Sequence, residues 1–344
     1  MKSLSLIFIL QIFAIGIVKS QSFTASDLVN LAVLPSGTID KYMKKKGFEL
    51  SCNEPEGDTV LARFIPKPKR NKTEGPPGKT VDVRFEPDTK YYTLDILSSK
   101  DYINSRKSLL RAGFYCADID NISNETPMLF QKANITILAT TGILDGVEHF
   151  CFILKQKKIP SEVNFAEDLL QFDSFQYLSS FFGRQNINND LNYFAKNELK
   201  KCSVLFDGTG RKSVFVWDDS HNLDHLLFII VSNKINTEGA DKDSSLTRKT
   251  SWPFHNGLYT GMSIKELLKL NEMDFHIYGK NADLAFMVVP EQTGNIDFTK
   301  TAVILNCNYC NDNIMFNSDM VSGLEVAKSN LPMKVHDIIV YPNN

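Results

Sequence analysis

The sequence contains little of several features that mark common protein classes. It has 18 Gly in 344 residues, about 5% against a usual ~7%, so it has little material for glycine-rich phosphate loops. Six Cys are too few for a disulfide-rich scaffold. Neither sign of charge is in excess, since 38 Lys and Arg face 40 Asp and Glu, whereas a dedicated nucleic-acid binder is strongly basic. We therefore predict no nucleic-acid partner.

Long apolar runs are also missing beyond the N-terminus, which predicts no transmembrane span in the mature chain. A shorter run from Leu4 to Val18 follows Lys2, and Ser20 supplies a small residue before a cleavage point. This pattern predicts a signal peptide over residues 1–20, with an uncleaved anchor as the alternative. The mature protein would lie in the periplasm, at the cell surface or outside the cell. Cleavage removes Lys2 and Lys19 and no acid, which takes the formal charge from −2 to −4.

Glycosylation sequons raise an alternative compartment. Four of them begin at Asn71, Asn121, Asn124 and Asn134. In a eukaryotic host they would indicate a secreted glycoprotein. In a chain this rich in Asn, chance also produces several.

The remaining composition is that of a folded protein. With 43% hydrophobic and 23% charged residues the chain can bury a core, and its length predicts two domains. Residues 22–158 contain the same pattern twice, a predicted helix followed by Gly-Phe and then by predicted strands. The Gly-Phe pairs are Gly47-Phe48 and Gly113-Phe114. Because strand runs follow one another without intervening helices, we expect an antiparallel sheet. We predict an α+β domain built as an internal duplication.

The second predicted domain, residues 159–344, follows a basic linker over 155–162. A helix is expected over Phe175–Phe182, ending at Gly183, and another after the capping box Ser263-Ile264-Lys265-Glu266. A long loop is expected over 233–249. Strands are expected at 202–206, 214–217, 226–231, 275–278, 285–289, 302–306 and 335–341. The second domain is therefore also α+β with an antiparallel sheet.

Cys307-Asn308-Tyr309-Cys310 is the segment with the strongest chemical signal. The neighbouring asparagines favour a turn, in which the two sulfurs could pair or share a metal ion. Structural thiols or a disulfide, with Cys202 as a further partner, are favoured. A redox role is disfavoured, because a thioredoxin-like βαβ context is not visible. Complete oxidation of all six cysteines would need a bridge between the domains, which hold three each.

Histidines could complete a zinc site with that pair. His221 and His225 are four residues apart, and neutral imidazoles with thiolates are suitable zinc ligands. The surrounding segment is polar, so a solvated loop is the favoured interpretation. Asp218 and Asp219 could instead act as paired carboxylates. We predict no cofactor, with zinc as the alternative.

Aromatic residues could line a ligand-binding surface. The candidates are Trp217, Trp252, Tyr259 and Tyr278, and the segment around Trp252 could form the rim of a pocket. Core packing is the favoured alternative, because a tryptophan buries a large area.

A series of sequence blocks from residue 163 onward carries a family resemblance. The blocks are 165–174, 177–178, 182–183, 193–194, 197–199, 201–206, 216–219, Trp252, 257–263, 266–267, 270–271, Phe275, 278–279 and the Cys307–Cys310 pair. On these blocks the chain resembles a family of uncharacterised exported Bacteroidetes proteins, and residues 22–158 resemble, with weaker motifs, a domain of such proteins. The resemblance implies a periplasmic or cell-surface protein and no reaction. The chain departs from the family pattern at Lys280–Leu284, where related sequences often have an aromatic residue, an acid and glycine.

Taken together, the sequence predicts an exported two-domain α+β protein that acts as a non-enzymatic binding module, with a protein or an envelope component as partner. The motifs G-x-S-x-G, H-E-x-x-H and G-x-G-x-x-G do not occur. The alternative is a metal-dependent or hydrolytic enzyme that uses His221, His225, Asp218, Cys307 and Cys310.

Overall fold

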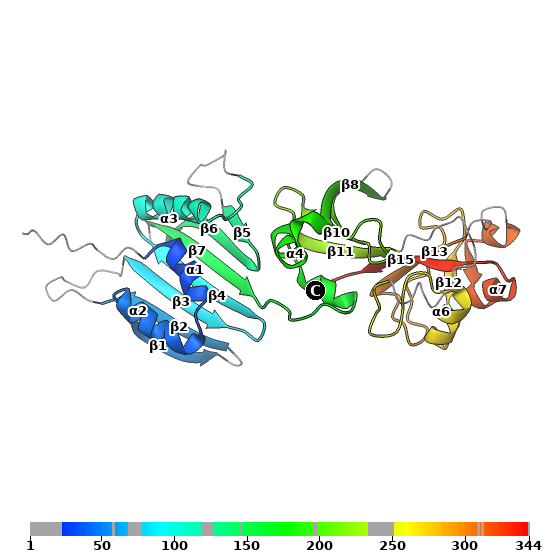
Figure 1. Cartoon of the computed structure of the whole chain (residues 1–344), viewed down its shortest axis with the longest axis horizontal. Coiled ribbons are helices and arrows are strands. Elements are labelled where there is room, and N and C mark those ends of the chain that lie inside the picture. The colour runs from blue at the N-terminus through cyan, green and yellow to red at the C-terminus, as the bar shows by residue number, and fades with distance from the viewer. Residues whose placement is uncertain are drawn as a thin grey trace, which may run out of the picture. The chain divides into compact units, whose positions relative to one another are not determined.

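The computed structural model describes residues 23–56, 59–67, 78–118, 127–144, 146–195, 198–232, 251–307, 310 and 313–342 (Figure 1). The predicted signal peptide and the predicted loop over 233–249 lie outside these residues. Within them, no helix is long and apolar enough to cross a membrane.

Two antiparallel sheets in different regions of the sequence confirm the α+β, two-domain class. By contacts, the first compact unit comprises residues 1–112, 124–127 and 138–154. The second comprises residues 113–123, 128–137 and 155–344. The boundary between residues 158 and 159, which the sequence predicts between the two domains, stays a prediction.

A seven-stranded sheet has the strand order β1-β2-β3-β4-β7-β6-β5, so the last strand of each predicted half lies at the centre. The first predicted half supplies four adjacent strands and the second supplies three, and the internal duplication stays a prediction. Its strands are β1 (Phe48–Glu56), β2 (Thr59–Pro66), β3 (Lys79–Phe85), β4 (Thr89–Ile96), β5 (Met128–Lys132), β6 (Ile135–Leu144) and β7 (Val147–Lys157).

The two Gly-Phe junctions have the same geometry. Gly47 and Gly113 both have φ of +82°, a left-handed conformation that glycine adopts without strain where a helix ends. The phenylalanines that follow, Phe48 and Phe114, are both buried. The repeated sequence pattern therefore corresponds to a repeated backbone turn.

Three helices accompany this sheet (Figure 1): α1 (Ala25–Ala32), α2 (Ile39–Lys45) and α3 (Ser99–Arg111). A capping box begins α1, since Thr24 N and Oγ1 donate to Asp27 Oδ2 at 2.9 and 3.1 Å. Ser26 Oγ donates to Ser108 Oγ at 2.8 Å and joins α1 to α3. Alternate residues of the central strands are buried, among them Tyr92, Leu94, Phe150 and Phe152.

The second unit contains a six-stranded sheet of order β13-β15-β11-β10-β9-β8 and a two-stranded sheet, β12-β14. The strands are β8 (Ile187–Ala195), β9 (Glu198–Leu205), β10 (Ser213–Asp219), β11 (Asp224–Ser232), β12 (His276–Tyr278), β13 (Thr301–Asn306), β14 (Met320–Ser322) and β15 (Lys334–Val340). The helices are α4 (Phe175–Phe182), α6 (Ile264–Asn271) and α7 (Gly323–Lys328), and the short 3₁₀ turns of the chain are η1 (Ser36–Thr38), η2 (Glu167–Gln171), η3 (Arg184–Asn186) and η4 (Ile314–Asn317).

One strand prediction in this unit was wrong, and one strand was missed. Residues 285–289 form no strand, and only Met287 and Val288 make isolated bridges, to Ile304 and Ile277. In contrast, β8 was not predicted, because its sequence Ile-Asn-Asn-Asp-Leu-Asn is rich in residues that disfavour strands. Strand β8 forms because it pairs with β9.

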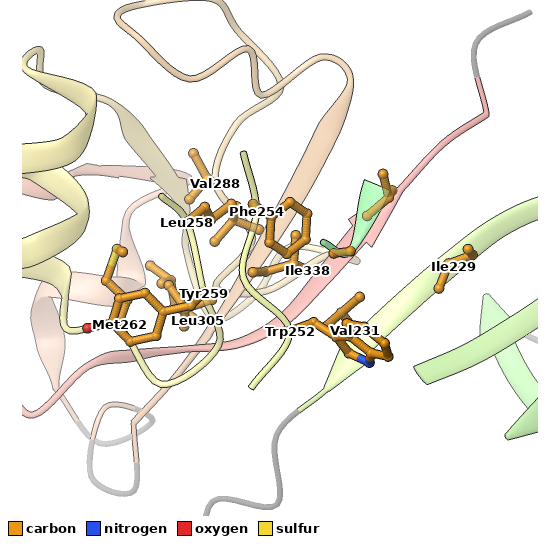
Figure 2. Close-up of a cluster of buried hydrophobic side chains, with 14 of the residues drawn as sticks. Ile229, Val231, Trp252, Phe254, Leu258, Tyr259, Met262, Val288, Leu305 and Ile338 are labelled. Carbon is orange, nitrogen blue, oxygen red and sulfur yellow. The ribbon is translucent and has the colours of Figure 1, made fainter. Parts of the chain in front are cut away.

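One hydrophobic core joins the six-stranded sheet to the segment 252–262. Figure 2 shows Trp252, Phe254 and Leu258 from this segment with Val231, Ile338 and Val288. Backbone hydrogen bonds also hold this segment, from Ala166 N to the Pro253 carbonyl at 2.9 Å and from Gly261 N to the Val335 carbonyl at 2.7 Å.

Candidate functional site

The four predicted binding aromatics do not form an open surface. Trp217, Trp252 and Tyr259 are no more than 5% exposed, and Tyr278 is half-buried. Trp217 Nε1 donates to Ser203 Oγ at 3.0 Å, and Tyr259 OH donates to Glu266 Oε1 at 3.1 Å. The core therefore uses three of these rings, as the core-packing alternative expects.

The second tryptophan contacts Arg211 in two ways, through its indole N–H and through the face of its ring. Trp252 Nε1 donates to the Arg211 carbonyl at 2.7 Å, while the Arg211 guanidinium lies 4.8 Å from the centre of the indole. A single residue thus satisfies the indole N–H and makes a cation–π contact. The structure gives Trp252 a packing role.

The Cys307–Cys310 pair forms a disulfide, which confirms the disulfide interpretation of the motif. Cys202 is not its partner, because Cys202 lies on β9 as a buried thiol whose Sγ donates to the Asp190 carbonyl at 3.6 Å. Burial raises the pKa of Cys202 to about 11, which keeps the thiol protonated at neutral pH. The two sulfurs in the disulfide are not thiolates and so are not zinc ligands.

The predicted zinc histidines lie close together in sequence, His221 in the turn after β10 that the Asp219 carboxylate organises and His225 on β11. Asp219 accepts from His221 N at 2.8 Å, Asn222 N at 3.0 Å and Asn222 Nδ2 at 2.7 Å. Partial burial raises the pKa of Asp219, but these hydrogen bonds outweigh that effect and the pKa is lowered. Asp218 is exposed. Asp219 therefore has a structural role in this turn, which does not support its use as one of two paired catalytic carboxylates.

Each of these two histidines pairs with an aspartate. His221 Nε2 lies 2.9 Å from Asp118 Oδ1, and His225 Nδ1 lies 3.0 Å from Asp224 Oδ1. Among the residues that the structure describes, no three His, Cys, Asp or Glu side chains gather as metal ligands. The predicted set of His221, His225 and cysteines is therefore not brought together.

A buried polar contact in this region escaped the sequence reasoning. Asp224 is 5% exposed, and its Oδ2 accepts from Gln131 Nε2 at 3.2 Å. Both residues belong to the second unit. Burial raises the pKa of Asp224, and the neighbouring His225 opposes this rise. Leu223 and His225, on either side of Asp224, have φ of +53° and +55°, so the turn holds the carboxylate in place with strained backbone.

An open groove of about 570 Å³ lies in the second unit. This volume lies within the ~300–1,000 Å³ range of small-molecule sites. We call it the Tyr341 groove. Its lining comprises Lys157, Glu167, Leu170, Asp173, Leu226, Lys300, Thr301, Val340, Tyr341 and Pro342.

The groove combines an apolar floor with charges of both signs. Leu170, Leu226 and Val340 supply the floor. Lys157 Nζ lies 2.7 Å from Asp173 Oδ2 and also donates to a backbone carbonyl of η2 at 3.3 Å. Burial raises the pKa of Tyr341, so its hydroxyl stays protonated and can donate a hydrogen bond.

The acid Glu167 and the base Lys300 of the groove differ in how firmly other groups hold them. Glu167 accepts from the His255 backbone N–H at 3.1 Å, which fixes its carboxylate. Lys300 is 76% exposed, and its Nζ lies 3.5 Å from Asp297. Lys300 is thus the cation that a ligand can reach with the smallest rearrangement. None of the lining residues was among the sequence candidates.

The described sequon, Asn134-Ile135-Thr136, has its acceptor nitrogen in use, because Asn134 Nδ2 donates to the Lys157 carbonyl. The sequons at Asn71, Asn121 and Asn124 lie outside the described residues.

Comparison of the chain with known protein families, with curated proteins and with solved structures finds no match. The resemblance to exported Bacteroidetes proteins therefore stays an expectation from the sequence.

Proposed function

We propose that this protein is an exported, non-enzymatic binding module whose Tyr341 groove holds a short zwitterionic peptide. The carrying observation is the groove itself, in which two lysines and two acids surround an apolar floor. A ligand with one charge of each sign and an apolar middle matches that arrangement. Its side chain would cover Leu170 and Leu226, and its carboxylate would face Lys300.

The contacts that the candidate catalytic residues make support binding over catalysis. Cys307 and Cys310 are joined to each other, and His221 and His225 each contact an aspartate. Asp218 is exposed, and its neighbour Asp219 organises a turn. The pair of sulfurs is thus removed from any nucleophilic or metal-binding role, and within the described part of the chain the exposed His221, His225 and Asp218 are not gathered as a metal site. We therefore do not carry the enzyme alternative further.

The disulfide supports the exported part of the proposal. Structural disulfides persist in the periplasm and outside cells, and are rare in reducing compartments. The periplasm or the cell surface is thus the proposed location, in agreement with the predicted signal peptide.

The peptide proposal is tested by saturation-transfer NMR with a free tripeptide, Lys-Leu-Glu, and with its N-acetylated, C-amidated form. We expect the free form to bind with a Kd of about 1 mM or tighter, and the blocked form to bind more weakly. Thr301→Trp should fill the groove and abolish the signal. Asn306→Trp, at the exposed other end of β13, is the matched control and should retain it.

A charge reversal gives a second readout on a folded protein. Lys300→Glu should weaken binding of the free tripeptide and leave the weak binding of the blocked form unchanged. Equal binding of both tripeptides to all variants, or no binding at a few millimolar, would remove the groove from the proposal.

A further inference from the structure

The second unit exposes several large apolar side chains in the region between residues 273 and 324. They are Met273 (59% exposed), Leu284 (54%), Ile314 (81%), Met320 (50%) and Leu324 (46%). Single exposed apolar residues are normal, but a gathering of them marks an interaction site. The question is therefore whether these five lie together.

Backbone pairing brings the first members together. In the β12–β14 sheet, Tyr278 is opposite Met320, so the two side chains share one face. Phe286 N donates to Tyr278 O at 3.0 Å, and Met287 N donates to Leu284 O at 3.1 Å. Leu284 therefore lies on the turn that follows β12, just before the chain returns to bond with Tyr278.

The η4 turn adds Ile314 to the same region. Lys280 N donates to the Phe316 carbonyl at 2.9 Å, and the Phe286 and Phe316 rings are 5.2 Å apart. Gly279 N donates to the Asp319 carbonyl at 2.9 Å, directly before Met320. The segment 314–320 is therefore attached along the end of β12.

A carboxylate joins the remaining two residues. Asp274 accepts from Ser322 Oγ at 2.6 Å and from Leu324 N at 2.9 Å, so Met273 and Leu324 flank the other end of the β12–β14 sheet. We call this region the Met320 surface. It comprises Met273, Tyr278, Leu284, Ile314, Met320 and Leu324.

Acidic side chains outnumber lysines around the Met320 surface. Residues 272–291 and 313–325 hold six acidic side chains against one lysine, whereas the whole chain is nearly balanced. The acids are Glu272, Asp274, Asp283, Glu291, Asp319 and Glu325. An apolar centre with an acidic rim complements a segment that is apolar on one side and basic at its edges.

We infer that the Met320 surface docks a basic amphipathic segment of a partner protein. The long, polarisable methionine side chains can adapt to such a segment, as at other peptide-binding surfaces. A second copy of this chain would oppose acid to acid, and an anionic lipid surface would be repelled. This site is separate from the Tyr341 groove and does not depend on the proposed peptide binding there.

The test uses three fluorescent peptides of about 14 residues, long enough to form a marginal helix. The first has Leu on one face and Lys on the other, the second has Leu and Glu, and the third has Ser and Lys. Fluorescence anisotropy should show binding of the Leu/Lys peptide at least about tenfold tighter than either of the others. Salt raised well above ~0.15 M should weaken it, because exposed charges are screened.

Variants locate the site. Met320→Ser and Leu284→Ser should each weaken binding of the Leu/Lys peptide about fivefold or more, the effect of losing one important interface contact. Ile143→Ser, at an 80% exposed position on β6, is the matched control and should leave it unchanged. Thr301→Trp, which fills the groove, should also leave it unchanged, so this proposal and the groove proposal can fail separately.

Three results would overturn the inference. The first is equal binding of the Leu/Glu and Leu/Lys peptides, because charge complementarity would then play no part. The second is binding that Met320→Ser and Leu284→Ser do not change. The third is dimerisation in sedimentation, or binding to zwitterionic vesicles, that Met320→Ser abolishes while the Leu/Lys peptide does not bind.

Discussion

Reduction of the Cys307–Cys310 disulfide should lower the free energy of unfolding of the second unit by about 2 kcal/mol. The bond links residues three positions apart, so it closes a short loop. For about four residues in the loop, the chain-entropy relation gives about 6 cal/mol/K, or about 1.9 kcal/mol at 25 °C. A longer loop would give a larger effect, so this estimate is specific to the pairing seen in the structure.

The protein carries its own probe for this measurement. Its two tryptophans, Trp217 and Trp252, belong to the same buried cluster as Cys307 and Cys310. Tryptophan fluorescence during urea unfolding therefore reports on the second unit. The midpoint should fall when reductant is added, with little change in slope, and the melting temperature should fall by about 4–8 °C.

A thiol outside the disulfide provides the control. Cys202→Ala removes a buried sulfur and lowers stability by itself, but the difference between oxidised and reduced protein should persist at about 2 kcal/mol. Coincident unfolding curves with and without reductant would refute the loop-entropy reasoning. Loss of the difference in Cys202→Ala would show that Cys202 takes part in the pairing.

Three further predictions concern backbone, cap and pH. Gly279→Ala should destabilise the second unit by about 1–3 kcal/mol in urea unfolding, because a Cβ would lie 1.8 Å from the Ser318 carbonyl; a neutral effect would contradict the close approach. Ser263→Ala should cost about 1 kcal/mol, since its Oγ accepts from Glu266 N at 3.3 Å, and thermal melting should show it. Burial raises the pKa of Asp224 in the folded protein. The contribution of Asp224 to the free energy of unfolding is therefore fully present at low pH and is lost as pH rises from about 3.9 through the folded pKa. The free energy of unfolding of Asp224→Asn, measured across pH, should lack this loss.

Local signals allowed much of the fold to be predicted. The helix over Phe175–Phe182 has the predicted bounds, and the capping box at Ser263 is formed. The Gly-Phe junctions predicted a repeated turn, which the φ values of Gly47 and Gly113 show. These features depend on residues within a few positions of one another, which is why sequence alone predicts them.

Features that depend on distant partners were missed. Strand β8 is polar and forms through pairing with β9, whereas residues 285–289 have strand composition but make only isolated bridges. The contact between Gln131 and Asp224 joins positions 93 residues apart. No spacing rule identifies such a pair, because folding and not sequence proximity brings the two residues together.

The Tyr341 groove shows the same limit for function. Its lining comes from β7, η2, β11, β13 and the end of β15, and no two of these segments form a motif in sequence. The candidates that looked chemical, such as Trp217 and Cys307, are the residues that the core uses. Residue types with strong chemical signals also bury well, so a sequence reading alone could not separate the two roles.

The central claim is that the Tyr341 groove is the ligand site. Its most direct test is a methyl NMR titration of protein labelled at Leu, Val and Met with the free tripeptide Lys-Leu-Glu. The account predicts chemical-shift changes that saturate at Leu170, Leu226 and Val340, with Met273 and Met320 unchanged. Saturating shifts elsewhere with none at these three methyl-bearing residues would contradict it.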